Sequence, residues 1–129
     1  MHTAAVCAGL LGLLVFALGL AVSLVRGQTN VVIGHTTDPT DRLYKLVRAH
    51  GNAAEFNPML AVLILYLGAG QPSSWLQRLF VAAAAARVLH AAGMILSPSL
   101  ARPQPLRAAG AVGTYAIGIA LAIIAIARA

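Results

Sequence analysis

The chain has 129 residues, of which 60% are hydrophobic and only 9% are charged. Soluble domains average about 25% charged residues, so this composition excludes an ordinary water-soluble domain and also a disordered chain. The length suits one compact unit, which excludes a multidomain enzyme. The formal net charge of +6 could indicate a nucleic-acid-binding protein, but the basic residues are dispersed among long apolar runs, so we predict no nucleic-acid partner. We therefore interpret the chain as a membrane protein in contact with lipids.

Four apolar segments approach the roughly 20 residues that a helix needs to cross a bilayer. In chain order, they predict helices over residues 4–25, 40–70, 74–96 and 106–128. Turn and capping residues precede the last three segments, at 38–41, 71–74 and 98–105. No segment alternates with period two, and open sheet edges cannot face lipid. The predicted fold class is all-α: one up-and-down membrane bundle of four transmembrane helices over residues 1–129.

The first segment, residues 4–25, is interpreted as a membrane helix and not as a cleaved signal peptide, because no basic region precedes it. Basic residues predict the orientation of the bundle. Most of them surround the first and third connections: Arg26, Arg42, Lys45, Arg48, Arg102 and Arg107. The positive-inside rule places these connections in the cytoplasm and both termini on the opposite side. In a bacterium, the chain would lie in the inner membrane.

Polar and ionisable residues gather at one depth of this predicted bundle. They come from the second helix, the third helix and the start of the fourth: Arg48, His50, Asn52, Glu55, Asn57, Arg87, His90 and Arg107. Charged groups inside a bilayer cost roughly 3 kcal/mol or more each and normally face a bundle interior. The cluster therefore predicts a functional site in the cytoplasmic half, and we expect the outer half to be inert.

Helical spacing separates the polar residues of the second helix into two faces. One stripe contains Lys45, Arg48, Asn52 and Glu55. His50 and Asn57 lie almost opposite this stripe. A four-helix protomer cannot bury both faces, so we expect one of them to meet another subunit. A different interpretation stays open, in which Arg48 and Glu55 form only a structural ion pair.

Residues 48–58 read Arg-Ala-His-Gly-Asn-Ala-Ala-Glu-Phe-Asn-Pro. This segment resembles the R-A-x-x-N-x-x-E-x-x-P signature of the MAPEG family, the membrane-associated proteins in eicosanoid and glutathione metabolism. The size and the four-helix layout agree with that family along the whole chain. The resemblance implies a homotrimer of four-helix protomers that binds glutathione in clefts between neighbouring subunits.

Carried over position by position, the resemblance implies that Arg48, Asn52 and Glu55 bind the backbone of glutathione. Arg48 would pair with a carboxylate and Glu55 with the amino group, which suits the bidentate chemistry of a guanidinium. His50 is similar in position to a residue that faces the neighbouring subunit's site in the leukotriene C4 synthase branch. Arg26 resembles the arginine that reaches a carboxylate of glutathione from the adjacent subunit.

The third helix resembles the family less closely. Arg87, His90 and Gly93 are similar to an R-x-x-H-x-x-G pattern of bacterial members, and the resemblance implies that Arg87 and His90 belong to the glutathione site. His90 and Met94 stand where the mammalian enzymes have tyrosines, and Phe56 likewise lacks a hydroxyl group. Three possible phenol donors are therefore missing, which we interpret as the mark of a subfamily.

Arg107, at the start of the fourth helix, resembles the arginine that stabilises the glutathione thiolate and is our catalytic candidate. Arg102 is the alternative, because the proline-rich connection leaves the register open. The implied mechanism is formation of the thiolate, which then attacks a lipophilic electrophile or a hydroperoxide from the bilayer. The implied activities are glutathione transferase and glutathione-dependent peroxidase, in detoxification, with glutathione as co-substrate. Tyr115, a phenol within the fourth helix, is expected to be an interface anchor or a packing residue.

The four histidines lack i, i+4 pairing and cysteine neighbours, so we predict no metal site. Cys7 is expected to be a packing residue. Two other functions stay open at this point. A scaffold or regulator with a vestigial site would bind glutathione without turnover, and a small transporter would use the polar cluster as an ion path. The transporter lacks a matching polar route through the outer half.

Overall fold

The structure, a computed structural model, describes residues 1–128. Its elements are four α-helices: α1 (His2–Thr29), α2 (Arg42–Gly68), α3 (Ser74–Leu96) and α4 (Pro105–Ala127). No strand occurs in these 128 residues, and the all-α class is confirmed. α1 extends beyond the apolar segment at both ends and stops where Asn30 adopts the left-handed conformation, with φ of 55°. Asparagine tolerates this conformation and can end a helix there.

Side-chain caps set the starts of α2 and α4. The carboxylate of Asp41 accepts a hydrogen bond from the backbone N–H of Tyr44 at 2.7 Å, which is why α2 begins at Arg42 and not at the expected residue 40. The side-chain oxygen of Gln104 accepts the backbone N–H of Arg107 at 2.6 Å. Both bonds satisfy donors that the first turn of a helix leaves without a partner.

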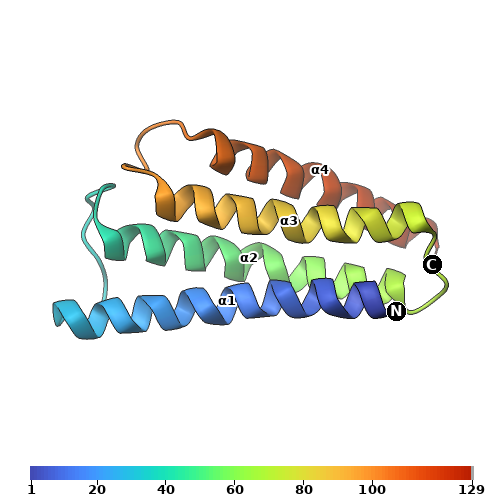
Figure 1. Cartoon of the computed structure of the whole chain (residues 1–129), viewed down its shortest axis with the longest axis horizontal. Coiled ribbons are helices and arrows are strands. Elements are labelled where there is room, and N and C mark those ends of the chain that lie inside the picture. The colour runs from blue at the N-terminus through green and yellow to red at the C-terminus, as the bar shows by residue number, and fades with distance from the viewer. Residues whose placement is uncertain (129) are drawn as a thin grey trace.

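The helices form two hairpins, α1 with α2 and α3 with α4, and α2 and α3 join the hairpins in the middle of the bundle. Figure 1 shows both long connections at one end, and the N-terminus, the α2–α3 turn and the end of α4 at the other. We call these the connection end and the terminal end. This arrangement matches the predicted topology, in which both basic connections share one side.

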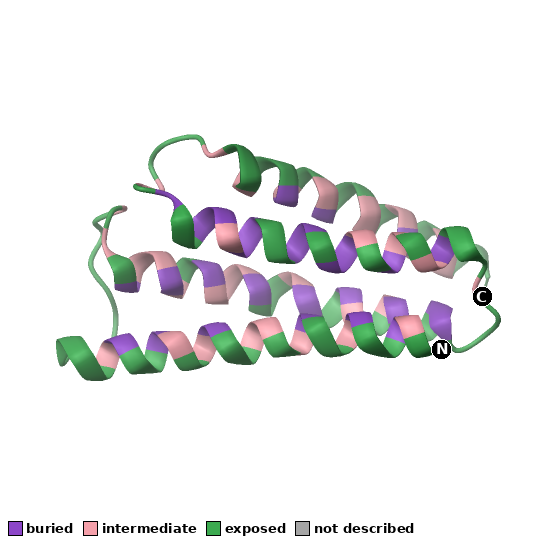
Figure 2. Ribbon diagram, in the orientation of Figure 1, coloured by how far each residue is buried: buried purple, intermediate pink, exposed green. Residues whose placement is uncertain are grey.

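Three helices, α1, α3 and α4, are long and apolar enough to cross a membrane. α2 has a similar length, but the polar residues of its first half lower its apolar character. Large apolar side chains cover the outside of the bundle, and Phe16 of α1 is 79% exposed. Figure 2 shows the continuous exposed face of α1. Such a surface suits lipid or a second subunit and not water.

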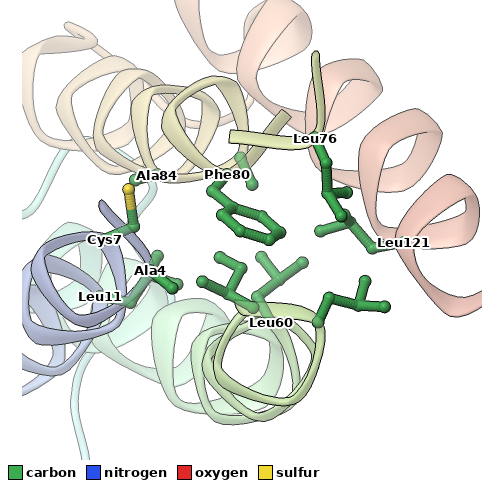
Figure 3. Packing of buried hydrophobic residues seen from close by; sticks show 11 residues of the cluster. Ala4, Cys7, Leu11, Leu60, Leu76, Phe80, Ala84 and Leu121 are labelled. Carbon is green, nitrogen blue, oxygen red and sulfur yellow. The ribbon is translucent and has the colours of Figure 1, made fainter. Parts of the chain in front are cut away.

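The terminal end is filled by hydrophobic side chains from all four helices, shown in Figure 3: Ala4, Cys7, Leu11, Leu60, Ile64, Leu67, Leu76, Phe80, Ala83, Ala84 and Leu121. Phe80 points into the middle of this cluster and is fully buried. A Cβ atom on Gly68 would overlap Ala4, so α1 and α2 approach closely here. Cys7 is a buried member of the cluster. We call this set the apolar cluster.

Candidate functional site

The guanidinium of Arg87 is the centre of a polar network inside the protomer. Arg87 is 1% exposed. Its Nε donates to Oδ1 of Asn57 at 2.8 Å, and its Nη2 donates to Oδ1 of Asn52 at 2.7 Å. Its Nη1 lies 3.4 Å from the hydroxyl of Thr114. The network joins α2, α3 and α4, and it satisfies a charge whose burial would otherwise be costly.

Asn57 extends this network to α1, because its Nδ2 donates to the carbonyl of Leu11 at 2.9 Å. His50 also faces α1, since a Cβ atom on Gly19 would lie 3.2 Å from its Nε2. The face of α2 that carries His50 and Asn57 therefore packs on α1 within the protomer. The helical spacing correctly predicts that these two residues share one face of α2. Within the protomer, α1 packs against much of that face.

The opposite stripe of α2 is the face that the protomer leaves open. Arg48 and Glu55 are exposed, and Asn52 between them is half-buried. In residues 1–128 no ion pair joins Arg48 to Glu55. The interpretation of this pair as a purely structural ion pair therefore has no contact to support it. Two opposite charges are presented outward from a helix in the middle of an apolar bundle.

A groove of about 470 Å³ runs between α2 and α4 beside this stripe, and Glu55 and Phe56 line it. The ring of Phe56 lies 5.3 Å from the Arg87 guanidinium carbon. Phe56 also meets Tyr115 edge to face, with ring centroids 5.6 Å apart. Tyr115 is 53% exposed and lines the groove with Thr114. Thr114 was not among the predicted site residues. The sequence feature that could have identified it is a hydroxyl group in an otherwise apolar helix.

His90 and Arg107 meet where α3 and α4 touch. Nδ1 of His90 lies 2.9 Å from the backbone carbonyl of Arg107. A carbonyl only accepts, so this bond assigns a proton to Nδ1, and in the neutral imidazole Nε2 is then an acceptor. A Cβ atom on Gly93 would overlap the backbone of Arg107, and one on Gly110 would meet the backbone of His90. The two glycines let the helices approach backbone to backbone.

The side chain of Arg107 turns toward the α3–α4 connection. Its Nη1 donates to the carbonyl of Leu100 and its Nη2 to the carbonyl of Arg102, both at 3.1 Å. An arginine has five N–H donors, so these bonds leave three for a ligand. Arg107 is half-buried whereas the side chain of Arg102 is exposed. These contacts favour Arg107 over Arg102 as the candidate arginine.

Arg26 and His50 line a different groove, of about 550 Å³, between α1 and α2. Arg26 donates to the carbonyls of Val32 and Gly34 at 3.3 and 3.4 Å. Its Nε is buried and has no hydrogen-bond partner in the described part of the chain. This groove lies on the α1 side of α2, whereas Glu55 lines the groove on the α4 side.

The predicted site residues therefore fall into separate groups within one protomer. Arg87 bonds to the half-buried Asn52, Arg48 and Glu55 face outward, and the remaining residues lie at the α1–α2 groove or the α3–α4 contact: Arg26, His50, His90 and Arg107. No group of histidine, cysteine and acidic residues in the described chain could hold a metal ion.

A model of the MAPEG family matches residues 4–127, which is nearly the whole chain. The chain belongs to the MAPEG family. No curated protein and no solved structure matches this chain. Membership in the MAPEG family confirms the resemblance of residues 48–58. The protein is an integral membrane bundle of the glutathione and eicosanoid metabolism family.

The two charges of the outward stripe have about the same spacing as the two ends of an extended tripeptide. Arg48 and Glu55 are seven residues apart, which is about 10 Å along a helix. An extended tripeptide also spans about 10 Å, and glutathione carries two carboxylates and one ammonium group. A cation and an anion at this separation match the charges of such a molecule.

Proposed function

We propose that this protein binds glutathione and uses it in one or both of two reactions: transfer of glutathione to lipophilic electrophiles, as a glutathione S-transferase, and reduction of hydroperoxides with glutathione as the reductant, as a glutathione-dependent peroxidase. The observation that carries the proposal is the outward stripe of α2, where Arg48 and Glu55 are exposed and not paired with each other. A charge that faces lipid costs roughly 3 kcal/mol or more. These two groups therefore need a partner that carries both a negative and a positive charge, and glutathione is such a molecule.

Asn52 is suited to bind the peptide between the two charges. Its Oδ1 accepts a hydrogen bond from Arg87, so its amide Nδ2 is the group that remains for a ligand carbonyl. Arg87 is buried, and in this proposal it orients Asn52 and does not touch the ligand. Arg48 binds a carboxylate of glutathione and Glu55 binds its amino group.

We also propose a homotrimer with three equivalent sites between subunits. Arg26 and His50 lie on the α1 side of α2, while Arg48 and Glu55 lie on the open side. Both groups can contact one ligand only if it lies between two copies of the chain. The buried Nε of Arg26 without a partner supports this arrangement. Light scattering corrected for detergent should give three protomers, and a monomer that still binds glutathione would contradict it.

The proposed chemistry needs no nucleophile from the protein. The guanidinium of Arg107 lies near the sulfur of glutathione and favours the thiolate, which is the nucleophile. The thiolate forms a bond to the electrophilic carbon of a lipophilic substrate, and the leaving group takes the electron pair. The groove between α2 and α4, lined largely by apolar side chains and Tyr115, gives such a substrate a place beside Glu55.

We propose that the site faces the cytoplasm, because the basic residues of both connections gather at the connection end. Both termini would then lie on the opposite side of the membrane. Reporter enzymes fused to the C-terminus and inserted into the α1–α2 connection should be active on opposite sides. A C-terminal reporter on the cytoplasmic side would reverse this orientation.

The activity is tested on purified protein, by calorimetry with glutathione and by conjugation and peroxidase assays with an aryl halide and an organic hydroperoxide. Glu55→Gln should lower the affinity by about tenfold or more, because it removes a charge that pairs with the ammonium group. Arg78→Gln is the matched control, since Arg78 is an exposed charge near the terminal end.

Binding without turnover would favour a scaffold, and the absence of binding would contradict the proposal. The apolar cluster gives a transporter no polar path at the terminal end.

A further inference from the structure

The α3–α4 connection contacts Arg107 at several points. The guanidinium donates to the carbonyls of Leu100 and Arg102, and the backbone N–H of Arg107 donates to the side chain of Gln104. The carbonyl of Arg107 accepts from His90. The position of the guanidinium therefore depends on where the connection lies, because both of its observed partners are backbone carbonyls of that connection.

The connection is itself attached to the first hairpin by two hydrogen bonds. The ammonium group of Lys45, on α2, donates to the carbonyl of Ser97 at 3.1 Å. The backbone N–H of Leu100 donates to the carbonyl of Pro39 at 2.9 Å. Leu100 thus binds the first hairpin through its N–H and Arg107 through its carbonyl.

Lys45 differs from the other charged residues of its stripe. Arg48 and Glu55 are exposed, whereas Lys45 is half-buried and its ammonium group points to the end of α3. Ser97 is 2% exposed, so water has little access to its carbonyl. If Lys45 loses its ammonium group, this carbonyl loses a partner that solvent replaces poorly.

We propose that Lys45 is a positioning residue for Arg107. By holding Ser97, it fixes the first residue of the connection whose carbonyls at Leu100 and Arg102 orient the guanidinium toward the sulfur of glutathione. This proposal rests on the proposed function, because it assumes that Arg107 stabilises the thiolate. It assigns a role to a residue that does not itself contact glutathione.

Two physical effects of Lys45 on the thiolate must be separated. Its charge could act through space, together with other titratable groups near the connection: His90 of α3, Arg102, Arg107, and the carboxylates of Asp38 and Asp41, which flank residues 39 and 40 of the first connection. Salt largely screens a through-space effect between exposed groups that are more than about 10 Å apart at 0.1 M, or about 3 Å apart at 1 M. Salt does not restore the orientation of a guanidinium that has lost its support.

The test measures the ultraviolet absorbance of the thiolate as a function of pH in the full-length protein with bound glutathione. Lys45→Met should move the midpoint to higher pH by about 0.5 unit, a roughly threefold loss of thiolate below the midpoint, in low and high salt alike. The KM for glutathione should change little. Lys45→Arg should have the same midpoint as the unsubstituted protein, since the introduced guanidinium can still donate to the carbonyl of Ser97.

Arg42→Met is the matched control. It removes the same charge from the exposed first residue of α2 and should leave the midpoint unchanged. Lys45→Leu, which also lacks a donor, serves if Lys45→Met does not fold, as judged by circular dichroism. Arg107→Ala separates the two proposals: if it leaves the midpoint unchanged, the activation by Arg107 is wrong. If Arg107→Ala moves the midpoint and neither Lys45 variant exceeds Arg42→Met, the role of Lys45 is wrong.

Discussion

The two ends of the bundle hold their helices together in different ways. At the terminal end, the apolar cluster packs around Phe80, and these contacts have no preferred direction. Around Arg87 and at the connection end, hydrogen bonds cross between helices, from Arg87 to α2 and α4 and from Lys45 to the end of α3. Hydrogen bonds require defined distances and angles. The polar half of the bundle therefore fixes the positions of individual atoms, which a binding site needs.

This difference also explains where unused polar groups remain. The buried guanidinium of Arg87 has its bonds inside the protomer, and it costs more to bury than an apolar side chain of similar size. Arg48 and Glu55 instead project from the same half with no mutual ion pair. We infer that the buried network keeps α2 in place so that the exposed charges meet a ligand at a fixed separation.

The largest expected effect is that of Arg87→Met. It leaves Oδ1 of Asn57 and Oδ1 of Asn52 without their donor, and each buried acceptor that loses its partner costs about 1–3 kcal/mol of unfolding free energy. The affinity for glutathione should also fall, because Asn52 loses its orientation. Thermal unfolding in detergent and calorimetry measure the two effects.

Phe80→Ala is the matched control at the terminal end. It empties a fully buried position and should destabilise the fold by a similar amount, roughly 3–5 kcal/mol. The glutathione affinity of the folded fraction should not change. If both variants lower the affinity equally, or if neither does, the distinction between the two ends does not hold.

Arg48→Ala should have the next largest effect, and on binding alone. Because Arg48 is exposed in the protomer, its removal should leave the unfolding temperature nearly unchanged. The affinity for glutathione should fall by about 2–5 kcal/mol if the carboxylate is desolvated in the site. Arg78→Ala is the control. If folded Arg48→Ala binds glutathione with unchanged affinity, the outward stripe has only a structural role.

Arg107→Ala should act on the chemistry more than on binding. The affinity for glutathione with a protonated thiol should stay nearly intact. The pH needed to form the thiolate should rise by about one unit, since only the charged sulfur loses a partner. Arg102→Ala should do neither, because it contributes only its backbone carbonyl to the contact with Arg107. If the two variants exchange effects, Arg102 is the activating residue.

The sequence was sufficient for the number of helices, because this depends on hydrophobicity along the chain. Periodicity also assigned His50 and Asn57 to one face of α2. It could not identify the neighbour of that face, which is α1, because the rotation of packed helices is set by all their contacts together. The partners of Arg107 were equally hidden, since backbone carbonyls carry no sequence signal.

The smallest expected effect concerns Asp38, in the α1–α2 connection. The carboxylate of Asp38 accepts hydrogen bonds from the backbone N–H of Thr40 at 2.8 Å and from its hydroxyl at 2.7 Å. The backbone bond first, and then the hydroxyl bond, hold the pKa of Asp38 below its usual range. Thr40→Val should therefore raise the pKa of Asp38 only in part, because the backbone donor remains. The measurement is an NMR titration of the Asp38 carboxyl carbon.

The sign of the accompanying stability change follows from linkage. Because the pKa of Asp38 is lower in the folded chain than in the unfolded chain, folding favours the ionised form of the Asp38 carboxyl group. The resulting stabilisation is fully present above the unfolded pKa, about 4, and is lost as the pH falls through the folded value. Thr40→Val should weaken this acid dependence, whereas Thr37→Val, at a neighbouring exposed threonine, should not. An unchanged Asp38 titration in Thr40→Val would show that the hydroxyl bond does not order this connection.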